Sequence, residues 1–332
     1  MSIQKKWTRR KFIRSSAATA AALPLAAKSM RLRAAVAPPP ACVFNPEQEE
    51  GPYYVDRELL RSDITEGKIG FPLRVRVIVV NAKTCAPIPN AALDVWHCDA
   101  GGVYSGYTKI NPGFGPGGPG GPGGAGFRGG RPPGPPPNGA GGDDMPAGPP
   151  PNGGPGGPGG PGGMGGPGGM PPKPRTTDDL VFLRGVQITD AQGTAAFKTI
   201  YPGHYPGRVN HIHMKVHIGG GATKPAAADS AHAGVAVYAG GHVAHTGQLF
   251  FPEDVSRFVE ATHPYSGHKI HRTTLEEDMV FGGQGGAGSV ARLTPVTSTQ
   301  LSDGYVATLT VAVDPEATPE LVGIGGRPRG SR

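Results

Sequence analysis

The sequence predicts an all-β fold, a β-sandwich of mostly antiparallel strands with long loops and few short helices. Three observations lead to this prediction. Several short segments alternate apolar and polar residues, which is the period of a half-buried strand. Turn-forming glycine, proline and asparagine separate these segments. Few segments show the apolar period of a helix, so strands must supply most of the core.

The predicted strands span 71–80, 91–97, 181–189, 195–200, 211–218 and 305–313. In the second of them, alternation places Leu93 and Val95 on one face and Asp94 and Trp96 on the other. The turn at 190–193 indicates a hairpin between the two strands that flank it. Short helices are predicted near 57–62 and at 252–259, the latter beginning at a proline followed by two acidic residues.

The N-terminal 37 residues have the features of a leader peptide. Residues 1–33 carry nine lysines and arginines and no acidic residue, which leaves 23 basic and 25 acidic residues in the rest of the chain. A twin-arginine pattern at 8–13 precedes an alanine-rich apolar stretch at 17–27. This pattern predicts export by the twin-arginine route to the periplasm or the outside of the cell. The apolar stretch is too short for a stable membrane anchor, and the near-neutral remainder argues against nucleic-acid binding.

The rest of the chain, 38–332, is predicted to form one domain that a glycine- and proline-rich insertion at 111–173 interrupts. Residues 111–170 hold 28 of the 56 glycines and offer few apolar side chains. Such a segment buries too little surface to offset the entropy of ordering it, so a disordered insertion is expected.

The chain contains three cysteines, Cys42, Cys85 and Cys98. In an oxidising compartment this number suits one disulfide and one remaining thiol. The sequence leaves the pairing open. Because no C-x-x-C spacing occurs, a cysteine-based metal site is not expected.

The strongest signal for a functional site lies at 201–213, where a Pro/Gly turn leads into a strand. His211 and His213 are two residues apart in that strand and therefore face the same way. An isolated H-x-H is more often a polar strand face than a metal site. Here Tyr205 and Arg208 lie directly upstream in the turn, which favours a metal site. His217 continues the same face and is expected to be structural or exposed.

A second signal lies at 94–104, where a strand runs into a glycine-containing turn that ends at Tyr104. Taken alone, such a tyrosine is more often a core residue at a strand end. Tyr104 is the last residue of the motif W-x-x-x-A-G-x-x-Y, and this motif indicates a functional site only in combination with the other motifs.

These motifs together resemble the intradiol ring-cleavage dioxygenases, the catechol and protocatechuate 3,4-dioxygenase family, and most closely its exported single-chain members. The resemblance covers most of 42–315 outside the Gly/Pro tract. The segments that carry it are 50–54 (EGPYY), 94–104, 182–185 with 199–203, 205–213 and 245–251 (HTGQLFF).

The resemblance implies a non-haem Fe(III) site whose metal ligands are Tyr104, Tyr205, His211 and His213. It also implies an active-site arginine at Arg208 and substrate contacts from Pro52, Tyr53 and Gln248. Phenolate is a hard anionic donor that suits oxidised iron, and two phenolates with two imidazoles leave room for a further ligand. Nearby residues are expected to pack or to lie at the surface: Tyr107, Tyr201, His97, His204 and His242.

The implied reaction is the cleavage by O2 of a catechol-type aromatic diol, between its two hydroxyl-bearing carbons, to a cis,cis-muconate-type diacid. Tyr205 would be displaced by the substrate and take up a proton, and Arg208 would stabilise negative charge on the ring. The sequence does not identify which catechol is the substrate, and it is compatible with a homo-oligomer.

Three other readings compete with this one. A non-catalytic β-sandwich binding module could retain the fold, although the complete ligand set argues against it. A zinc hydrolase would favour His, Cys and carboxylate ligands over two tyrosines. A structural protein built on the Gly/Pro tract does not fit a tract confined to one insertion.

Overall fold

The computed structural model describes residues 42–110, 174–224 and 234–323, all of which belong to one structural unit, Pro39–Arg332. The leader predicted at 1–37 and the insertion predicted at 111–173 lie outside the described residues. Among the described residues, none of the helices combines the length and the apolar character needed to cross a lipid bilayer.

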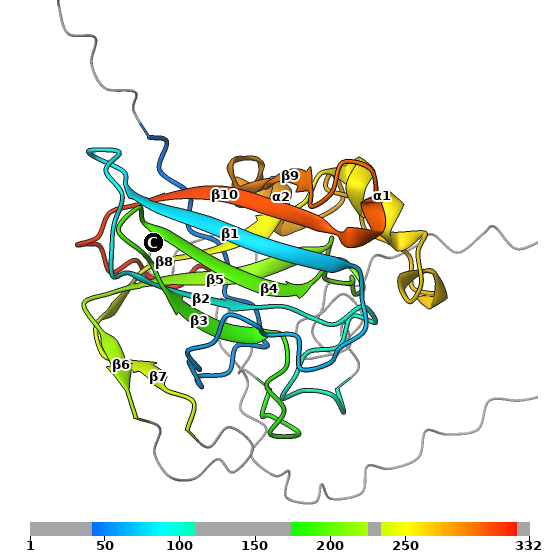
Figure 1. Cartoon of the computed structure of the whole chain (residues 1–332), viewed down its shortest axis with the longest axis horizontal. Coiled ribbons are helices and arrows are strands. Elements are labelled where there is room, and N and C mark those ends of the chain that lie inside the picture. Colours follow the sequence, from blue (N-terminus) through cyan, green and yellow to red (C-terminus); the bar gives the residue numbers. More distant parts are fainter. Residues whose placement is uncertain (1–41, 111–173, 225–233, 324–332) are drawn as a thin grey trace, which may run out of the picture. The chain divides into compact units, whose positions relative to one another are not determined.

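Two four-stranded sheets form the body of the domain, so the predicted β-sandwich is confirmed (Figure 1). The first sheet has the order β4 (Thr194–Ile200), β1 (Pro72–Asn81), β10 (Tyr305–Val313) and β9 (Arg292–Pro295). The second has the order β3 (Arg184–Ile188), β2 (Ala92–Trp96), β5 (His211–Ile218) and β8 (His242–Phe250). The described pairings are antiparallel except that of β1 with β10, which is parallel.

The described residues also form a two-stranded ribbon and several short helices outside the two sheets. A two-stranded ribbon pairs β6 (Gly221–Thr223) with β7 (Val237–Ala239). The α-helices are α1 (Glu253–Glu260), close to the predicted helix at 252–259, and α2 (Met279–Gly283). Short 3₁₀ turns span Tyr265–Gly267, Gly286–Ser289 and Leu301–Asp303.

The main core lies between the two sheets, where alternating residues of each strand meet. Strand β1 buries every second residue from Leu73 to Val79, as its sequence period predicts. From the second sheet, Leu93 and Val95 enter the same core. Burying an aliphatic side chain of this size contributes roughly 1.5–3 kcal/mol relative to leaving it exposed, so this layer accounts for much of the drive to fold.

Three sequence-based expectations about local structure are wrong. The turn at 190–193 forms, but β3 and β4 pair with β2 and β1 respectively, so this connection crosses between sheets and makes no hairpin. The strand expected at 181–189 begins only at Arg184, because Leu183 adopts a φ of 58° that interrupts extended backbone. No helix forms near 57–62, where Leu59 and Leu60 make isolated bridges to β7 and β3 instead.

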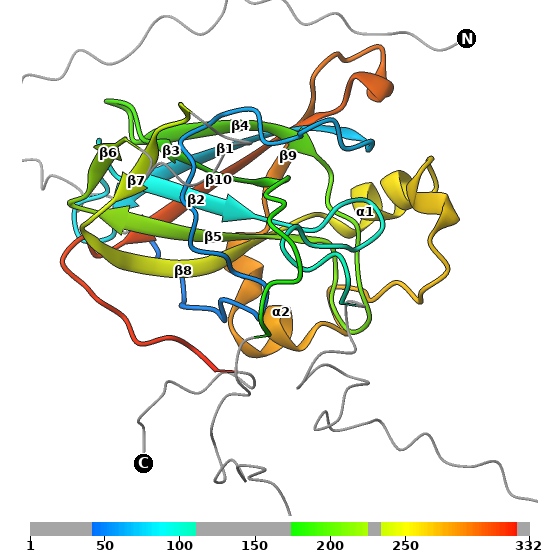
Figure 2. The ribbon, with the colours of Figure 1, turned by 90° about the horizontal axis from the view of Figure 1, so that it is seen from below.

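The other face of the second sheet is buried although it is polar. We call residues 45–60 the N-terminal arm. The arm crosses this face in Figure 2, and hydrogen bonds tie it to strand backbone of the second sheet: Gln48 N donates to the carbonyl oxygen of Thr246 on β8, and Val186 N on β3 donates to that of Leu59. Polar side chains of β2, β5 and β8 therefore lie in a buried layer between sheet and arm. The charged and polar groups in such a layer must find partners within the protein or in a bound ion. Buried clusters of ionisable groups are common at functional sites.

Candidate metal centre

Four side chains with metal-ligating atoms converge beneath the N-terminal arm. His211 and His213 project from the same face of β5, and their Nε2 atoms are 3.0 Å apart. Tyr205 Oη lies 3.4 Å from Nε2 of His211. The ring centroid of Tyr104 lies 5.8 Å from that of Tyr205 and 6.2 Å from that of His213. All four are buried, and we call them the Tyr/His cluster.

Tyr104 is delivered by the turn that follows β2. Asp99 Oδ1 accepts hydrogen bonds from two backbone N–H groups of this turn and so holds it closed. Gly102, with a φ of 81°, packs so closely that a Cβ there would lie 2.3 Å from the carbonyl oxygen of His204. Only glycine fits such an approach, which places this turn against the one that carries Tyr205.

The turn that carries Tyr205 is fastened to the end of α1. Glu260 Oε1 lies 2.9 Å from Nδ1 of His204 and accepts a 2.7 Å hydrogen bond from Asn210 Nδ2. His204 and Asn210 flank Tyr205 on its two sides in the sequence. One carboxylate therefore fixes both ends of the turn. Nothing in the sequence pattern singled out Glu260, because its partners come from a distant segment.

Both imidazoles are oriented by their neighbours. His211 Nδ1 lies 2.5 Å from the carbonyl oxygen of Val209. A carbonyl can only accept, so Nδ1 carries the proton and Nε2 presents its lone pair to the cluster. The ring of His213 stacks on Trp96 at 5.1 Å with an interplanar angle of 6°. On the arm side, Gly51 approaches so closely that a Cβ would lie 2.9 Å from Cε1 of His213.

Arg208 lies beside the Tyr/His cluster among buried acceptors. Its Nε donates to Asp278 Oδ2 at 2.9 Å, its Nη1 lies 3.5 Å from Glu49 Oε1, and its Nη2 donates to Gln248 Oε1. Burial works against the charge, but the nearby Tyr205, Asp278 and Glu49 outweigh it and raise the pKa of the Arg208 guanidinium above its ordinary value. Arg208 is therefore a permanent cation at this position.

The predicted substrate contacts fall in different places. Gln248, on β8, reaches the cluster through Arg208. The ring of Tyr53 stacks on Tyr104 at 4.8 Å and meets Tyr205 edge-on at 6.2 Å, so it covers both phenols. Pro52 lies exposed next to it on the arm.

The electrostatics of the cluster suit a cation. Burial, with a contribution from Arg208, lowers the pKa of His211 to about 3, and burial with the neighbouring His211 lowers that of His213 well below its ordinary value. Both imidazoles are thus neutral, which is the form that binds metals. Burial raises the pKa of Tyr104 and Tyr205 even with Arg208 nearby, so these phenols ionise at neutral pH only when a metal ion binds to them.

The hydroxyl of Tyr104 supports the same conclusion. Its Oη is buried and has no hydrogen-bond partner among the described residues. An orphaned buried oxygen is rare and calls for an explanation such as an ion. Two phenols and two neutral imidazoles form a donor set that fits non-haem iron(III).

Other residues near the motifs lie outside the cluster. His97 is buried with its Nε2 2.7 Å from Thr199 Oγ1, and Tyr201 Oη lies 2.7 Å from Ser256 Oγ. His242 lies partly exposed with its Nε2 3.0 Å from the carbonyl oxygen of Pro315. These positions serve packing and hydrogen bonding.

Asp278 is a site residue that the sequence reasoning missed. It binds Arg208 and also caps α2 through its second oxygen, which accepts from Val280 N and Phe281 N. An aspartate before a short apolar run is a helix-start signal, so the cap could have been predicted from the sequence. Its bond to Arg208, seventy residues away, could not.

The cysteine pairing is given by the structure. A disulfide joins Cys42 and Cys85, and Cys98 is a buried thiol that packs with the aromatic residues around Tyr104 and Tyr205.

Comparison with known proteins places this geometry in context. No protein-family model matches the sequence, and the search of curated proteins finds no relative. Among solved structures, an intradiol ring-cleavage dioxygenase from Tetranychus urticae matches with a TM-score of 0.56 and 27% identity, over 84% of this chain and 98% of that chain. A second crystal structure, of a dioxygenase, matches with a TM-score of 0.57 and 28% identity over the same shares. Across most of its length the chain thus has the fold of the intradiol ring-cleavage dioxygenases, the family that its motifs resemble.

Proposed function

We propose that the protein is an Fe(III)-dependent intradiol dioxygenase that cleaves a catechol-type aromatic diol with O2 to a cis,cis-muconate-type diacid. The observation that carries the proposal is the convergence of Tyr104, Tyr205, His211 and His213 in one buried cluster beside the fixed cation Arg208. The similarity in fold to an intradiol dioxygenase supports the same reaction class.

The four residues of the Tyr/His cluster would hold the iron. When bound there, Fe(III) supplies the Lewis acidity that ionises the phenols and activates an aromatic diol towards O2. Burial raises the pKa of both phenols, so each would lose its proton at neutral pH only on binding the metal ion. The neutral imidazoles need no proton change to act as ligands.

Tyr205 is the residue best placed to move a proton. A catechol must lose protons from its hydroxyls to bind as a dianion, and a base within the site has to accept them. Burial raises the pKa of Tyr205, so its phenolate oxygen is a strong base that retains a proton once it has taken one up. Tyr104, whose pKa is raised further by burial and by Tyr205, would remain a ligand.

Arg208 would stabilise negative charge on the substrate. Its guanidinium cannot lose its proton, and Asp278 holds its Nε at 2.9 Å while Gln248 accepts from Nη2. A cation held in place before the reaction need not reorganise when charge develops on the ring. Tyr53, stacked on Tyr104, provides an apolar surface of the kind that a flat aromatic substrate packs against.

The experiment is metal analysis of the natively matured protein, followed by oxygen uptake with a panel of catechols. We expect iron, a reddish colour from phenolate-to-iron charge transfer, and a muconate-type product absorbing in the near ultraviolet. Arg208→Leu should keep iron and colour but lose turnover, whereas His242→Gln, a histidine change outside the cluster, should keep all three.

Two results would overturn the proposal. Zinc in place of iron would refute the metal assignment, and a yellow semialdehyde product would show cleavage outside the diol. A colourless protein that binds catechols without consuming O2 would instead establish the binding-module alternative.

We also propose that the protein is exported through the twin-arginine leader to the periplasm or the outside of the cell. The disulfide between Cys42 and Cys85 supports this, because disulfides persist in oxidising compartments. Changing Arg9 and Arg10 to lysine should retain the protein in the cytoplasm; unchanged export would refute the proposed route.

A further inference from the structure

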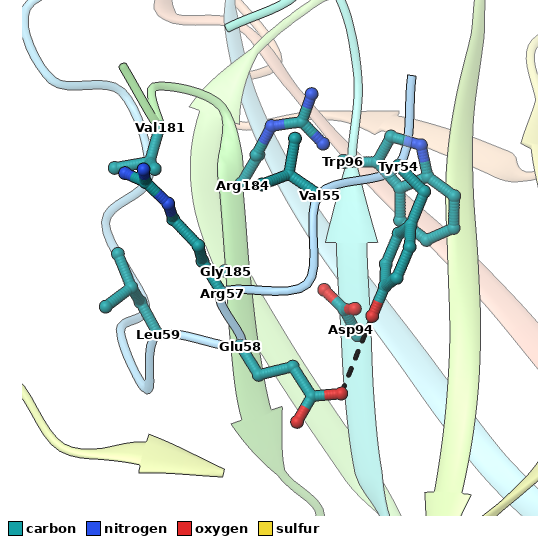
Figure 3. A pocket seen from close by; sticks show the side chains of 10 residues that line it. All are labelled: Tyr54, Val55, Arg57, Glu58, Leu59, Asp94, Trp96, Val181, Arg184 and Gly185. Carbon is teal, nitrogen blue, oxygen red and sulfur yellow. Dashed lines mark hydrogen bonds between the residues drawn. The ribbon is translucent and has the colours of Figure 1, made fainter. Parts of the chain in front are cut away.

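A second group of potential ligands lies on the same buried face as the Tyr/His cluster, further along the strands. Glu58 of the N-terminal arm, Asp94 of β2 and His217 of β5 each offer one ligand atom, and these atoms all lie within 4.8 Å of one another. None of the three is a member of the Tyr/His cluster. Figure 3 shows Glu58 and Asp94 at a small cavity, with the hydroxyl of Tyr54 beside both.

Two of these side chains are deeply buried and incompletely bonded. Asp94 is 5% exposed and His217 is 6% exposed. Asp94 Oδ2 and His217 Nε2 have no hydrogen-bond partner among the described residues. Glu58 Oε1 lies 3.7 Å from His217 Nδ1, which is too far for a hydrogen bond. Buried polar atoms without partners are uncommon, so these two atoms need an explanation.

The local charges do not cancel. Three carboxylates, Glu50, Glu58 and Asp94, gather around two cations. Lys215, although it lies opposite Asp94 in the strand register, pairs with Glu50 at 2.5 Å. Arg184 donates to backbone carbonyls and a serine hydroxyl. Unless one of these carboxyls takes up a proton, a negative charge remains without a compensating cation in this buried layer, where it is strongly unfavourable.

The chemistry of the three groups fits a metal ion. Burial and the charge of Lys215 lower the pKa of His217 to about 4, so its imidazole is neutral and keeps a lone pair for a ligand bond. Burial raises the pKa of Asp94 to about 7, which marks a carboxylate in need of a cation or a proton. A cavity of about 10 Å³, roughly the size of one water molecule, adjoins Asp94 and Glu58, although His217 does not line it.

We propose that Glu58, Asp94 and His217 form a second metal site, which binds a divalent transition-metal ion such as Zn²⁺. One imidazole and two carboxylates are a common donor set for Zn²⁺, with water completing the tetrahedron. The ion would join the arm to β2 and β5. Since the same arm carries Tyr53 over the Tyr/His cluster, the second site would hold that cover in place. The proposal does not depend on the metal or the reaction assigned to the Tyr/His cluster.

The test compares Zn²⁺ binding by the full-length wild type with binding by Asp94→Asn. Each protein is freed of loosely bound metal by dialysis, titrated with Zn²⁺ by calorimetry and assayed for bound metal. The readout is the difference between the two, so any zinc taken up elsewhere cancels. We expect one equivalent per chain fewer in Asp94→Asn, or at least about tenfold weaker binding of that equivalent.

Two further variants make the result decisive. Glu58→Gln should lose the same equivalent, and its position on the arm makes it less disruptive to the sheet if Asp94→Asn fails to fold. His271→Gln changes an exposed histidine away from the site and should bind as the wild type does. Equal zinc uptake by wild type, Glu58→Gln and Asp94→Asn would overturn the proposal and would identify Asp94 as a carboxyl that is simply protonated.

Discussion

Asp278 allows the most specific prediction, because one carboxylate serves two structural purposes. Its Oδ2 accepts from Arg208 Nε at 2.9 Å and from Val209 N at 2.8 Å, and its Oδ1 caps α2. The change Asp278→Asn keeps the cap, since asparagine is as good an N-cap residue as aspartate. It removes the charge opposite Arg208 and turns an amide N–H₂ group towards two donors.

The expected loss of stability follows from this geometry. Breaking a buried ion pair by neutralising one partner typically costs about 3–5 kcal/mol, because the other charge stays buried. For a domain of this size each kcal/mol lowers Tm by roughly 2–4 °C, so Tm should fall by roughly 6–20 °C. The Arg208 charge and the backbone donors, outweighing burial, hold the pKa of Asp278 below its ordinary value of 3.8. Its contribution is therefore complete at neutral pH and is lost only as pH falls below that value, so the comparison belongs at pH 7.

The assay is reversible thermal unfolding of wild type, Asp278→Asn and a matched control, Asp63→Asn. Asp63 also pairs with a basic residue, Lys198, at 2.8 Å, but both side chains are largely exposed. Exposed pairs contribute about 1 kcal/mol or less, so the control should change Tm by only a few degrees. If Asp278→Asn lowers Tm no more than the control, the buried pair does not stabilise the domain as we infer.

Three further predictions concern other parts of the domain. His97 is buried, and burial lowers the pKa of its imidazole from 6.5 to about 4. The contribution of the neutral imidazole to the free energy of unfolding is therefore complete above pH 6.5 and is lost as the pH falls towards 4. His97→Gln should narrow the difference in unfolding free energy between pH 7 and pH 5 by about 2 kcal/mol, measured by denaturant titration; an unchanged difference would contradict the assignment. Gly51→Ala should lower the metal content, because its Cβ would lie 2.9 Å from Cε1 of His213 at a φ of 74°. Full metal loading of this variant would show that the arm can move away at no cost. Replacing 117–169 with a short Gly/Ser linker should change stability by about 1 kcal/mol or less, since Asp178 already ties the described flanks of that segment together and closure entropy varies slowly with length. Loss of bound metal in the shortened protein would count against this.

The fold was largely predictable because its strands carry a clear period. Three predicted segments match strands of the first sheet within a residue or two: 71–80, 195–200 and 305–313. Buried and more exposed residues alternate along these strands, because only one face of that sheet packs against the core. Strand β8 was not predicted. It is buried on both faces because the arm covers its outer side, so its polar residues break the alternation that marks a strand.

The site residues that belong to short sequence motifs could be predicted from the sequence, whereas the residues that support them could not. His211, His213, Tyr205 and Tyr104 stand in recognisable motifs, and the structure brings them together. Their supporting partners come from elsewhere in the chain: Glu260 at the end of α1, Asp278 at the start of α2 and Glu49 on the arm. Each has the appearance of an ordinary surface acid in the sequence. Only long-range packing determines which of these acids become buried.

The parallel pairing of β1 with β10 has a consequence for how the chain folds. These neighbours at the centre of the first sheet join Leu73 to Tyr305, so more than two hundred residues must be made and positioned before the pair can form. Contacts of such sequence separation form slowly, because the entropy of closing the chain comes before any contact energy. A ribosome-bound chain that lacks β10 would leave one edge of β1 open, with an unpaired row of backbone groups suited to aggregation. The first sheet can therefore be completed only after β10 has been synthesised. A protein truncated before residue 305 should be insoluble.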